Sequence, residues 1–163
     1  MGDAVDLRVE RVPLHATAGL RDRVLRPNGS RTAVTWAALD VAGAATFAVF
    51  VGDRPADGDA ASEAIATVTV MPRACPWRPD ATAPWRLRGM ATDDGWRGRG
   101  VGRCALDTAV DHVSDRGASV LWCNARIAAS SFYERAGFVV EGEEFDVGVI
   151  GPHYPMARPI SAA

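Results

Sequence analysis

A chain of 163 residues with a formal net charge of −2 has the size of one folded domain, which can bury a core without disulfides or metal ions. Apolar residues make up 48% and charged residues 23%, which is ordinary for a folded soluble protein and gives no reason to expect a nucleic acid as partner. No stretch approaches the roughly 20 consecutive apolar residues that a membrane-spanning helix needs.

The cysteines and the start of the chain suggest a reducing compartment. Cys75, Cys104 and Cys123 are far apart and form no Cys-x-x-Cys pair, so neither a zinc ribbon nor a disulfide framework is indicated. The first six residues are acidic and lack the positive start and apolar run of a signal peptide. We therefore expect one cytoplasmic domain over residues 1–163, with no bound metal, no nucleic acid and no membrane partner. The oligomeric state stays open, a homodimer included.

The first half of the chain predicts a strand, a weak helix and a hairpin. Leu7–Val12 alternates apolar and charged residues as a half-buried strand does, and Pro13 ends it. In chain order there follow a helix at Leu14–Leu25, a turn at Arg26–Gly29, and two hairpin strands at Thr46–Val51 and Ile65–Met71 around the loop Gly52–Ser62.

A proline-rich loop, Pro72–Pro84, comes next. Its four prolines exclude regular structure, and a loop of this length is uncommon in a compact domain and is often functional. Trp77 offers a large flat apolar surface. The loop therefore either borders an acceptor site and helps to select the substrate, or covers core with Trp77.

The second half of the chain predicts alternating strands and helices. The clearest helix is Val101–Arg116, whose apolar stripe precedes Gly117 at the place of a left-handed cap. The other predicted elements are strands at Trp85–Thr92, Ala118–Asn124, Phe138–Phe145 and Tyr154–Arg158, and a short helix at Ala128–Ala136 closed by Gly137. The unit at residues 85–124 requires a parallel right-handed crossover, so the fold is α/β, a mixed sheet with helices on both faces.

The glycine-rich segment Arg97–Gly102 lies between a predicted strand and the best helix. Its glycines let the backbone turn sharply and approach a ligand. The free N–H groups of the first helical turn, the helix dipole and the charges of Arg97 and Arg99 suit a pyrophosphate. A Walker A loop needs Gly-Lys-Ser/Thr, and Gly102-Arg103-Cys104 offers neither the lysine nor the hydroxyl. A dinucleotide-binding fingerprint needs Gly-x-Gly-x-x-Gly after the first strand of the sheet, a spacing that this segment does not have. A plain glycine-rich turn with solvated arginines remains the third interpretation.

A second motif lies downstream of this loop. Arg97-x-x-Gly100-x-Gly102 resembles the acyl-CoA pyrophosphate loop of the GNAT superfamily of N-acetyltransferases. Asn124-Ala125-Arg126 and the segment Ala129–Phe138 look like the second half of that signature, and several short strings look like an uncharacterised bacterial branch. The resemblance implies a mostly antiparallel sheet with one central, splayed parallel pair. It implies acetyl-CoA as cosubstrate and a primary amine, on a small molecule or a peptide, as acceptor.

The resemblance also implies roles for individual residues. Tyr133 matches the family's general acid, and a phenol can protonate the CoA thiolate as it leaves. Its helical position predicts an edge apart from the core face formed by Ala129, Phe132 and Ala136. The resemblance assigns contacts with the cosubstrate to Met90, Ala91, Thr92, Arg97, Gly98, Arg99, Gly100, Val101, Gly102, Asn124 and Ser131.

The sequence leaves the general base and the acceptor open. Base candidates are Glu143, Glu144, Asp93 and His153, of which His153 is preferred because a neutral imidazole is poised near neutral pH. Arg86, Arg88 and Arg126 either flank a site for a carboxylate-bearing amine or are solvated, and solvation is the favoured interpretation. The leading function is direct acetyl transfer through a tetrahedral intermediate. The alternatives are a non-catalytic acyl-CoA-binding or sensing module and, less well supported, a nucleotide-binding protein.

Overall fold

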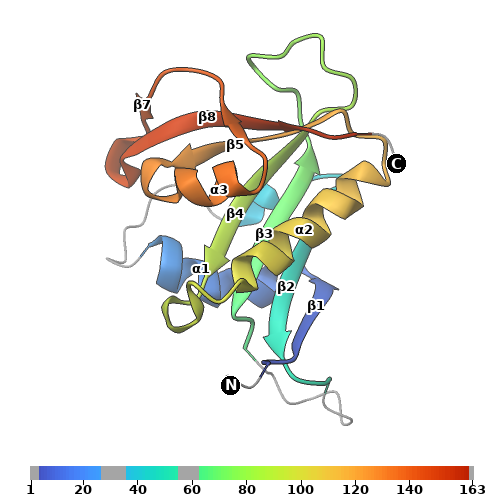
Figure 1. The fold of residues 1–163 in the computed structure, drawn as a ribbon, viewed down its shortest axis with the longest axis vertical. Coiled ribbons are helices and arrows are strands. Elements are labelled where there is room, and N and C mark those ends of the chain that lie inside the picture. The colour runs from blue at the N-terminus through green and yellow to red at the C-terminus, as the bar shows by residue number, and fades with distance from the viewer. Residues whose placement is uncertain (1–3, 27–35, 55–62, 162–163) are drawn as a thin grey trace. The chain divides into compact units, whose positions relative to one another are not determined.

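The computed structural model describes residues 4–26, 36–54 and 63–161. Its strands are hydrogen-bonded in the order β1-β2-β3-β4-β5-β8-β6, with β7 paired to β8. Figure 1 labels all of these strands except β6. The strands are β1 Leu7–Val12, β2 Ala45–Val51, β3 Ala66–Pro72, β4 Trp85–Thr92, β5 Val120–Arg126, β6 Val139–Val140, β7 Phe145–Asp146 and β8 Pro152–Pro159. The helices are α1 Ala18–Leu25, α2 Val101–Ser114 and α3 Ser130–Arg135, with short 3₁₀ turns η1 Leu14–Thr17, η2 Trp36–Leu39, η3 Asp94–Trp96, η4 Ile127–Ala129 and η5 Gly148–Ile150.

The sheet is mixed and mostly antiparallel, which confirms the predicted fold class. Its parallel pair is β4 with β5, the two strands that flank α2 in the chain. The chain forms two compact units: residues 1–40, 45–69 and 89–109 make the first, and residues 41–44, 70–88 and 110–163 make the second. Among the described residues, no helix is long and apolar enough to cross a membrane.

The first unit is built on the antiparallel pair β1–β2. The register runs from Leu7 opposite Val51 to Val12 opposite Thr46. Helix α1 buries Leu20 in a cluster with Ala48, Ala64 and Ala91, so the predicted weak helix is held by packing more than by its own propensity. The predicted turn at 26–29 and most of the hairpin loop lie outside the described residues.

Helix α2 confirms the prediction from its apolar stripe. The stripe residues are all buried: Val101, Ala105, Leu106, Ala109, Val110 and Val113. Gly117 adopts φ of 73° just after the helix, in the left-handed region expected of a C-terminal cap. The predicted helix ended two residues beyond the last residue of α2, a difference that is common at frayed helix ends.

The second unit is built on β5 and the long strand β8. These strands are antiparallel over seven residue pairs, from Val120 opposite Pro159 to Arg126 opposite His153. The prediction of one strand over 138–145 was wrong, because only β6 and β7 pair with β8 there. The backbone at Gly142 passes so close to Pro155 that a Cβ would lie 2.7 Å from its ring, and the chain bends away between the two short strands.

The proline-rich loop packs onto this second unit. The ring of Trp77 meets that of Trp122 edge-on, with centroids 5.1 Å apart, beside buried Cys75, Val120 and Ala157. Its indole N–H donates to Glu141 at 2.7 Å, and Arg78 donates to the same carboxylate. The Arg78 hydrogen bond is the main cause of a lowered pKa of Glu141. These contacts favour the interpretation in which Trp77 covers core.

Trp77→Ala is therefore expected to lower the free energy of unfolding by about 2 kcal/mol, because a half-buried indole and its hydrogen bond are lost. In a chain of this length the melting temperature would fall by about 4–8 °C. Thermal melts measure the change, with Trp77→Phe as control, since it keeps most ring contacts and loses only the bond to Glu141. If Trp77→Ala melts at the normal temperature and has a raised KM for the amine, the loop lines the acceptor site instead.

Candidate functional site

The glycine loop belongs to the first unit and is fully exposed before α2 begins. Residues 97–100 form turns, and the backbone N–H of Cys104 donates to the carbonyl of Gly100 as the helix starts. Gly98 and Gly100 have φ of 74° and 77°, in the left-handed region where other residues are strained. A Cβ at either position would meet no atom within 4 Å, so this face of the loop opens to solvent. An exposed glycine backbone at the start of a helix is a kind of site that suits an anion.

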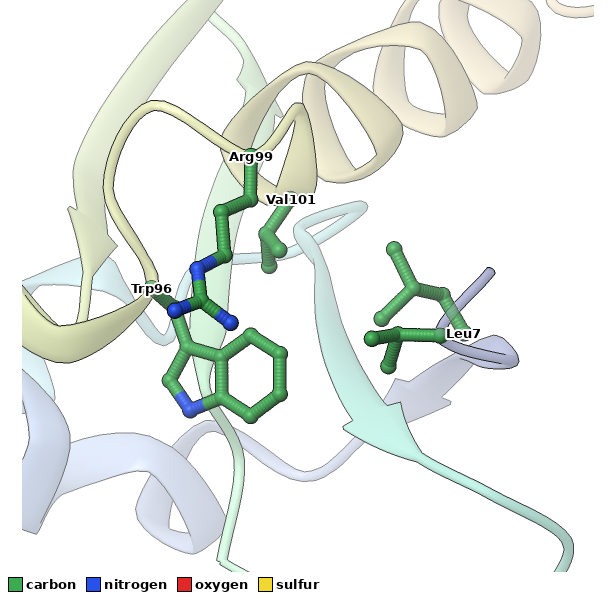
Figure 2. Close-up of a pocket in the computed structure, with 5 residues that line it drawn as sticks. Leu7, Trp96, Arg99 and Val101 are labelled. Atoms are coloured by element: carbon green, nitrogen blue, oxygen red, sulfur yellow. The ribbon is translucent and has the colours of Figure 1, made fainter. Parts of the chain in front are cut away.

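The two arginines of the loop are engaged only weakly. Arg97 pairs with Asp94 at 3.1 Å, but both side chains are more than half exposed, and such pairs contribute little. The Arg99 guanidinium lies over the Trp96 ring, 5.2 Å from its centroid. Figure 2 shows this stack on one side of a pocket and Leu7 on the other. The pocket has a volume of about 280 Å³, and Val5 and Val101 complete its lining. Both cations are thus available to a ligand at small cost.

Strand β4 carries the positions predicted to hold the thioester arm, and a buried arginine fixes its backbone there. The Arg21 side chain is fully buried and its Nε donates to the carbonyl of Gly89 at 3.0 Å. Its terminal nitrogens donate to Thr17 at 2.8 Å and Thr69 at 2.6 Å. Burial lowers the pKa of Arg21 to about 10. Gly89 itself has φ of 62°, so the strand is kinked directly before Met90.

Gly89→Ala is expected to destabilise the fold by about 2–4 kcal/mol, from left-handed strain and overpacking together. The new Cβ would lie 2.6 Å from Nε of Arg21 and 3.1 Å from Cδ1 of Leu39. Chemical denaturation measures the loss, with Gly98→Ala as the control that carries similar backbone strain and no clash. Equal losses in the two variants would show that the Arg21 contact is not tight.

Sequence reasoning missed Arg21, since an arginine on a weak helix looks like any surface residue. One signal was present. Thr67 and Thr69 interrupt the apolar run of β3 two residues apart, hence on one face of the strand, and both are fully buried. Buried hydroxyls need partners, and the Arg21 guanidinium supplies one.

The second unit carries Asn124, Ser131 and Tyr133. Asn124 is half-buried on β5, and Ser131 is exposed in the first turn of α3. The prediction that Tyr133 lies apart from the buried face of its helix was wrong, because the residue is 6% exposed and its ring meets those of Phe132 and Phe138 edge-on. The cause is Gly137, whose φ of 89° turns the chain back, so that the Phe138 N–H donates to the carbonyl of Tyr133. Burial raises the pKa of Tyr133 well above its usual value, with a smaller contribution from Cys123.

The base candidates differ in their surroundings. Asp93 accepts a bond from Arg23 at 3.1 Å and caps the turn at Gly95, and these bonds lower its pKa, so its carboxylate is a poor base. Glu143 and Glu144 are exposed. His153 is 7% exposed, and its Nδ1 lies 2.9 Å from the carbonyl of Gly151. A carbonyl can only accept, so Nδ1 is the donor in this contact and Nε2 is the ring nitrogen left for proton transfer.

The three arginines suggested for an acceptor site are only partly exposed to solvent. Arg86, Arg88 and Arg126 are each half-buried, and burial lowers the pKa of all three, to about 10 for Arg86. Within the part of the chain that the structure describes, no group of three or more His, Cys, Asp or Glu is placed to hold a metal ion.

Comparison with known proteins identifies the family and the fold. The Acetyltransferase (GNAT) domain family matches residues 78–158. The chain is similar to the uncharacterized N-acetyltransferase YitI of Bacillus subtilis (strain 168), at 30% identity over 154 residues that cover 94% of this chain and 97% of YitI. Its fold is similar to that of the ribosomal-protein-S18-alanine N-acetyltransferase from Escherichia coli, with a TM-score of 0.69 at 19% identity over 97% and 96% of the two chains. It is also similar to a chain of the NatC complex bound to Gag peptide and CoA, with a TM-score of 0.70 at 10% identity over 96% and 99%.

The relation to YitI extends over nearly the whole of both sequences, and the matched family domain contains β4, the glycine loop, α2 and Tyr133. This chain therefore belongs to the GNAT family of N-acetyltransferases, acyltransferases that use acetyl-CoA and act on amine acceptors.

Proposed function

We propose that this protein moves the acetyl group of acetyl-CoA directly to a primary amine, with Tyr133 as general acid. The observation that carries the proposal is the exposed loop at the start of α2, where two left-handed glycines and two weakly held arginines face solvent. Backbone N–H groups and arginines suit the pyrophosphate of CoA, which carries two negative charges. The assignment of residues 1–163 to a single catalytic domain stays a prediction.

The parallel pairing of β4 and β5 supports a place for the pantetheine arm. The register joins Trp85 to Leu121 and Arg86 to Trp122, and does not include Leu87 and Arg88. Strand edges without a neighbour bind extended ligands through their backbone groups. In this proposal the backbone of Met90–Thr92 holds the arm and polarises the thioester carbonyl. Asn124 and Ser131 are further contacts with the cosubstrate.

The transfer step forms a C–N bond and breaks the thioester C–S bond. The neutral amine attacks the carbonyl carbon, the amine gives up one proton to a base, and the departing thiolate takes a proton from the Tyr133 phenol. The phenolate regains its proton from solvent, so the products are an N-acetyl amine and CoA. Burial keeps the Tyr133 phenol protonated at neutral pH, so in this proposal it donates a proton and does not act as the base.

We propose His153 as the base, acting through Nε2. His153→Gln is expected to lower kcat/KM by about 10²-fold or more, because base catalysis at neutral pH is worth about 10²–10⁴-fold. Glu143→Gln and Glu144→Gln are the controls, as both carboxylates are exposed. A normal rate in His153→Gln, with a loss in either control, would transfer the role to that glutamate.

A screen of amines with the purified protein and acetyl-CoA tests the proposed function. Mass spectrometry of each mixture should show a mass gain of one acetyl group on one chemical class of amine. Thermal shifts with CoA, ATP and NAD, run beside it, should show stabilisation by CoA alone. Binding of CoA without acetylation of any amine would favour an acyl-CoA-binding or sensing module.

A further inference from the structure

Two arginines share one face of β4. Trp85 and Leu87 are buried on the opposite face, at 6% and 3% exposure, so the alternation of the strand places Arg86 and Arg88 together. The Arg86 guanidinium lies over the ring of Trp122, 4.7 Å from its centroid. Such stacking fixes the direction of a guanidinium while leaving its N–H groups free to bond.

A third arginine completes this cluster in the second unit. Arg73 follows β3, and its backbone carbonyl accepts the indole N–H of Trp122 at 3.0 Å. Burial is the main cause of the lowered pKa of Arg86 and of Arg88, and the positive charge of Arg73 lowers both values further. The charge of Arg88 also lowers the pKa of Arg86. Arg73, which is exposed, thus adds a third positive charge near the two half-buried arginines of β4.

The cluster has no counter-charge within the described residues. Neither Arg86 nor Arg88 forms an ion pair there, and the buried Nε of Arg86 has no hydrogen-bond partner. Glu141, a carboxylate of the same unit, is already held by Arg78 and Trp77. Half-buried like charges and an unpaired donor are costly, and a bound anion would relieve both.

We propose that Arg73, Arg86 and Arg88 form a subsite that binds the carboxylate of the acceptor amine. The proposal rests on the proposed function and names the substrate class, an amino acid or another small amine with a free carboxylate. Planar guanidinium groups bind carboxylates through paired hydrogen bonds. Arg88 is two residues before Met90 in the sequence of β4, so the same strand carries the proposed subsite and the proposed thioester contacts.

The test is a binding measurement that needs no turnover. N-acetyl amino acids and the matching N-acetyl amino acid amides are titrated against the wild type by calorimetry in the presence of CoA. The acids are expected to bind about tenfold more tightly than the amides, or better, as hydrogen bonds between charged groups are strong. This ratio should fall toward one in Arg86→Gln and Arg88→Gln and stay unchanged in Arg116→Gln, an exposed arginine on the same unit. Thermal melts establish that each variant is folded.

Three outcomes of the binding measurement would overturn the subsite. The first is equal binding of acids and amides to the wild type. The second is an affinity ratio of acid to amide that is unchanged in both substituted proteins. The third is tighter binding of inorganic phosphate and phosphoethanolamine than of any carboxylate. Acetylation of neutral amines with the same efficiency as acids would remove the subsite and leave the transferase intact. Carboxylate binding that depends on Arg86 and Arg88, without acetylation of any amine, would keep the subsite and remove the proposed reaction.

Discussion

Tyr133→Phe is expected to lower kcat by about 10²–10⁴-fold while KM for acetyl-CoA changes little. The variant loses only the hydroxyl, and with it the proton for the departing thiolate. A phenylalanine ring keeps the edge-on contacts with Phe132 and Phe138, so the fold should keep its stability. Single-turnover kinetics measure the chemical step without interference from product release.

Tyr154→Phe is the matched control, since Tyr133 and Tyr154 are the two tyrosines of the chain. Tyr154 lies on β8 opposite Ala125 and has no role in the proposed reaction. Its variant should turn over at the wild-type rate. A loss of less than about fivefold in Tyr133→Phe under single-turnover conditions would reduce Tyr133 to a packing residue.

Gly100→Asp is expected to weaken CoA binding by about 100-fold or more. The new carboxylate would stand where the pyrophosphate is proposed to bind, and two unit charges about 5 Å apart repel by about 3 kcal/mol at an effective dielectric constant of 20. Calorimetric titration with CoA measures the change. Since a Cβ at this position meets no atom, the fold has room for the side chain.

Two further variants separate charge from backbone strain. Gly100→Ala keeps the strain of a side chain at φ of 77° and adds no charge, so its loss of affinity should be much smaller. Gly117→Asp places the same carboxylate at φ of 73° with equally open surroundings after α2, and should leave CoA affinity unchanged. Wild-type affinity in Gly100→Asp would show that the phosphates bind elsewhere.

Local sequence signals were sufficient for elements whose structure depends mainly on their own residues. The apolar stripe and the left-handed Gly117 located α2, and the bounds of β1 and β4 agree with the prediction. Helix α3 was less well predicted, because six residues make less than two turns and periodicity says little about which face is buried. Tyr133 is covered by Phe138, which returns only after the turn at Gly137.

Features that depend on long-range contacts could not be predicted from the sequence. Arg21 is 68 residues from Gly89, and no local pattern indicates that its guanidinium is buried against that strand. Trp77 is 64 residues from Glu141 and was compatible with either a substrate wall or a packed loop. Arg86 and Arg88 alternate with apolar residues as solvated side chains do, and no local pattern indicates that Arg86 lies over the ring of Trp122.

The central claim is tested most directly by a product balance under one set of conditions. The purified protein is incubated with acetyl-CoA and a responsive amine, and free CoA thiol and N-acetyl amine are both quantified over time. Direct transfer predicts equal amounts of the two products, formed by the wild type and nearly abolished in Tyr133→Phe and, at limiting acetyl-CoA, in Gly100→Asp. Release of CoA without an N-acetyl amine, or binding of acetyl-CoA with neither product, would contradict it.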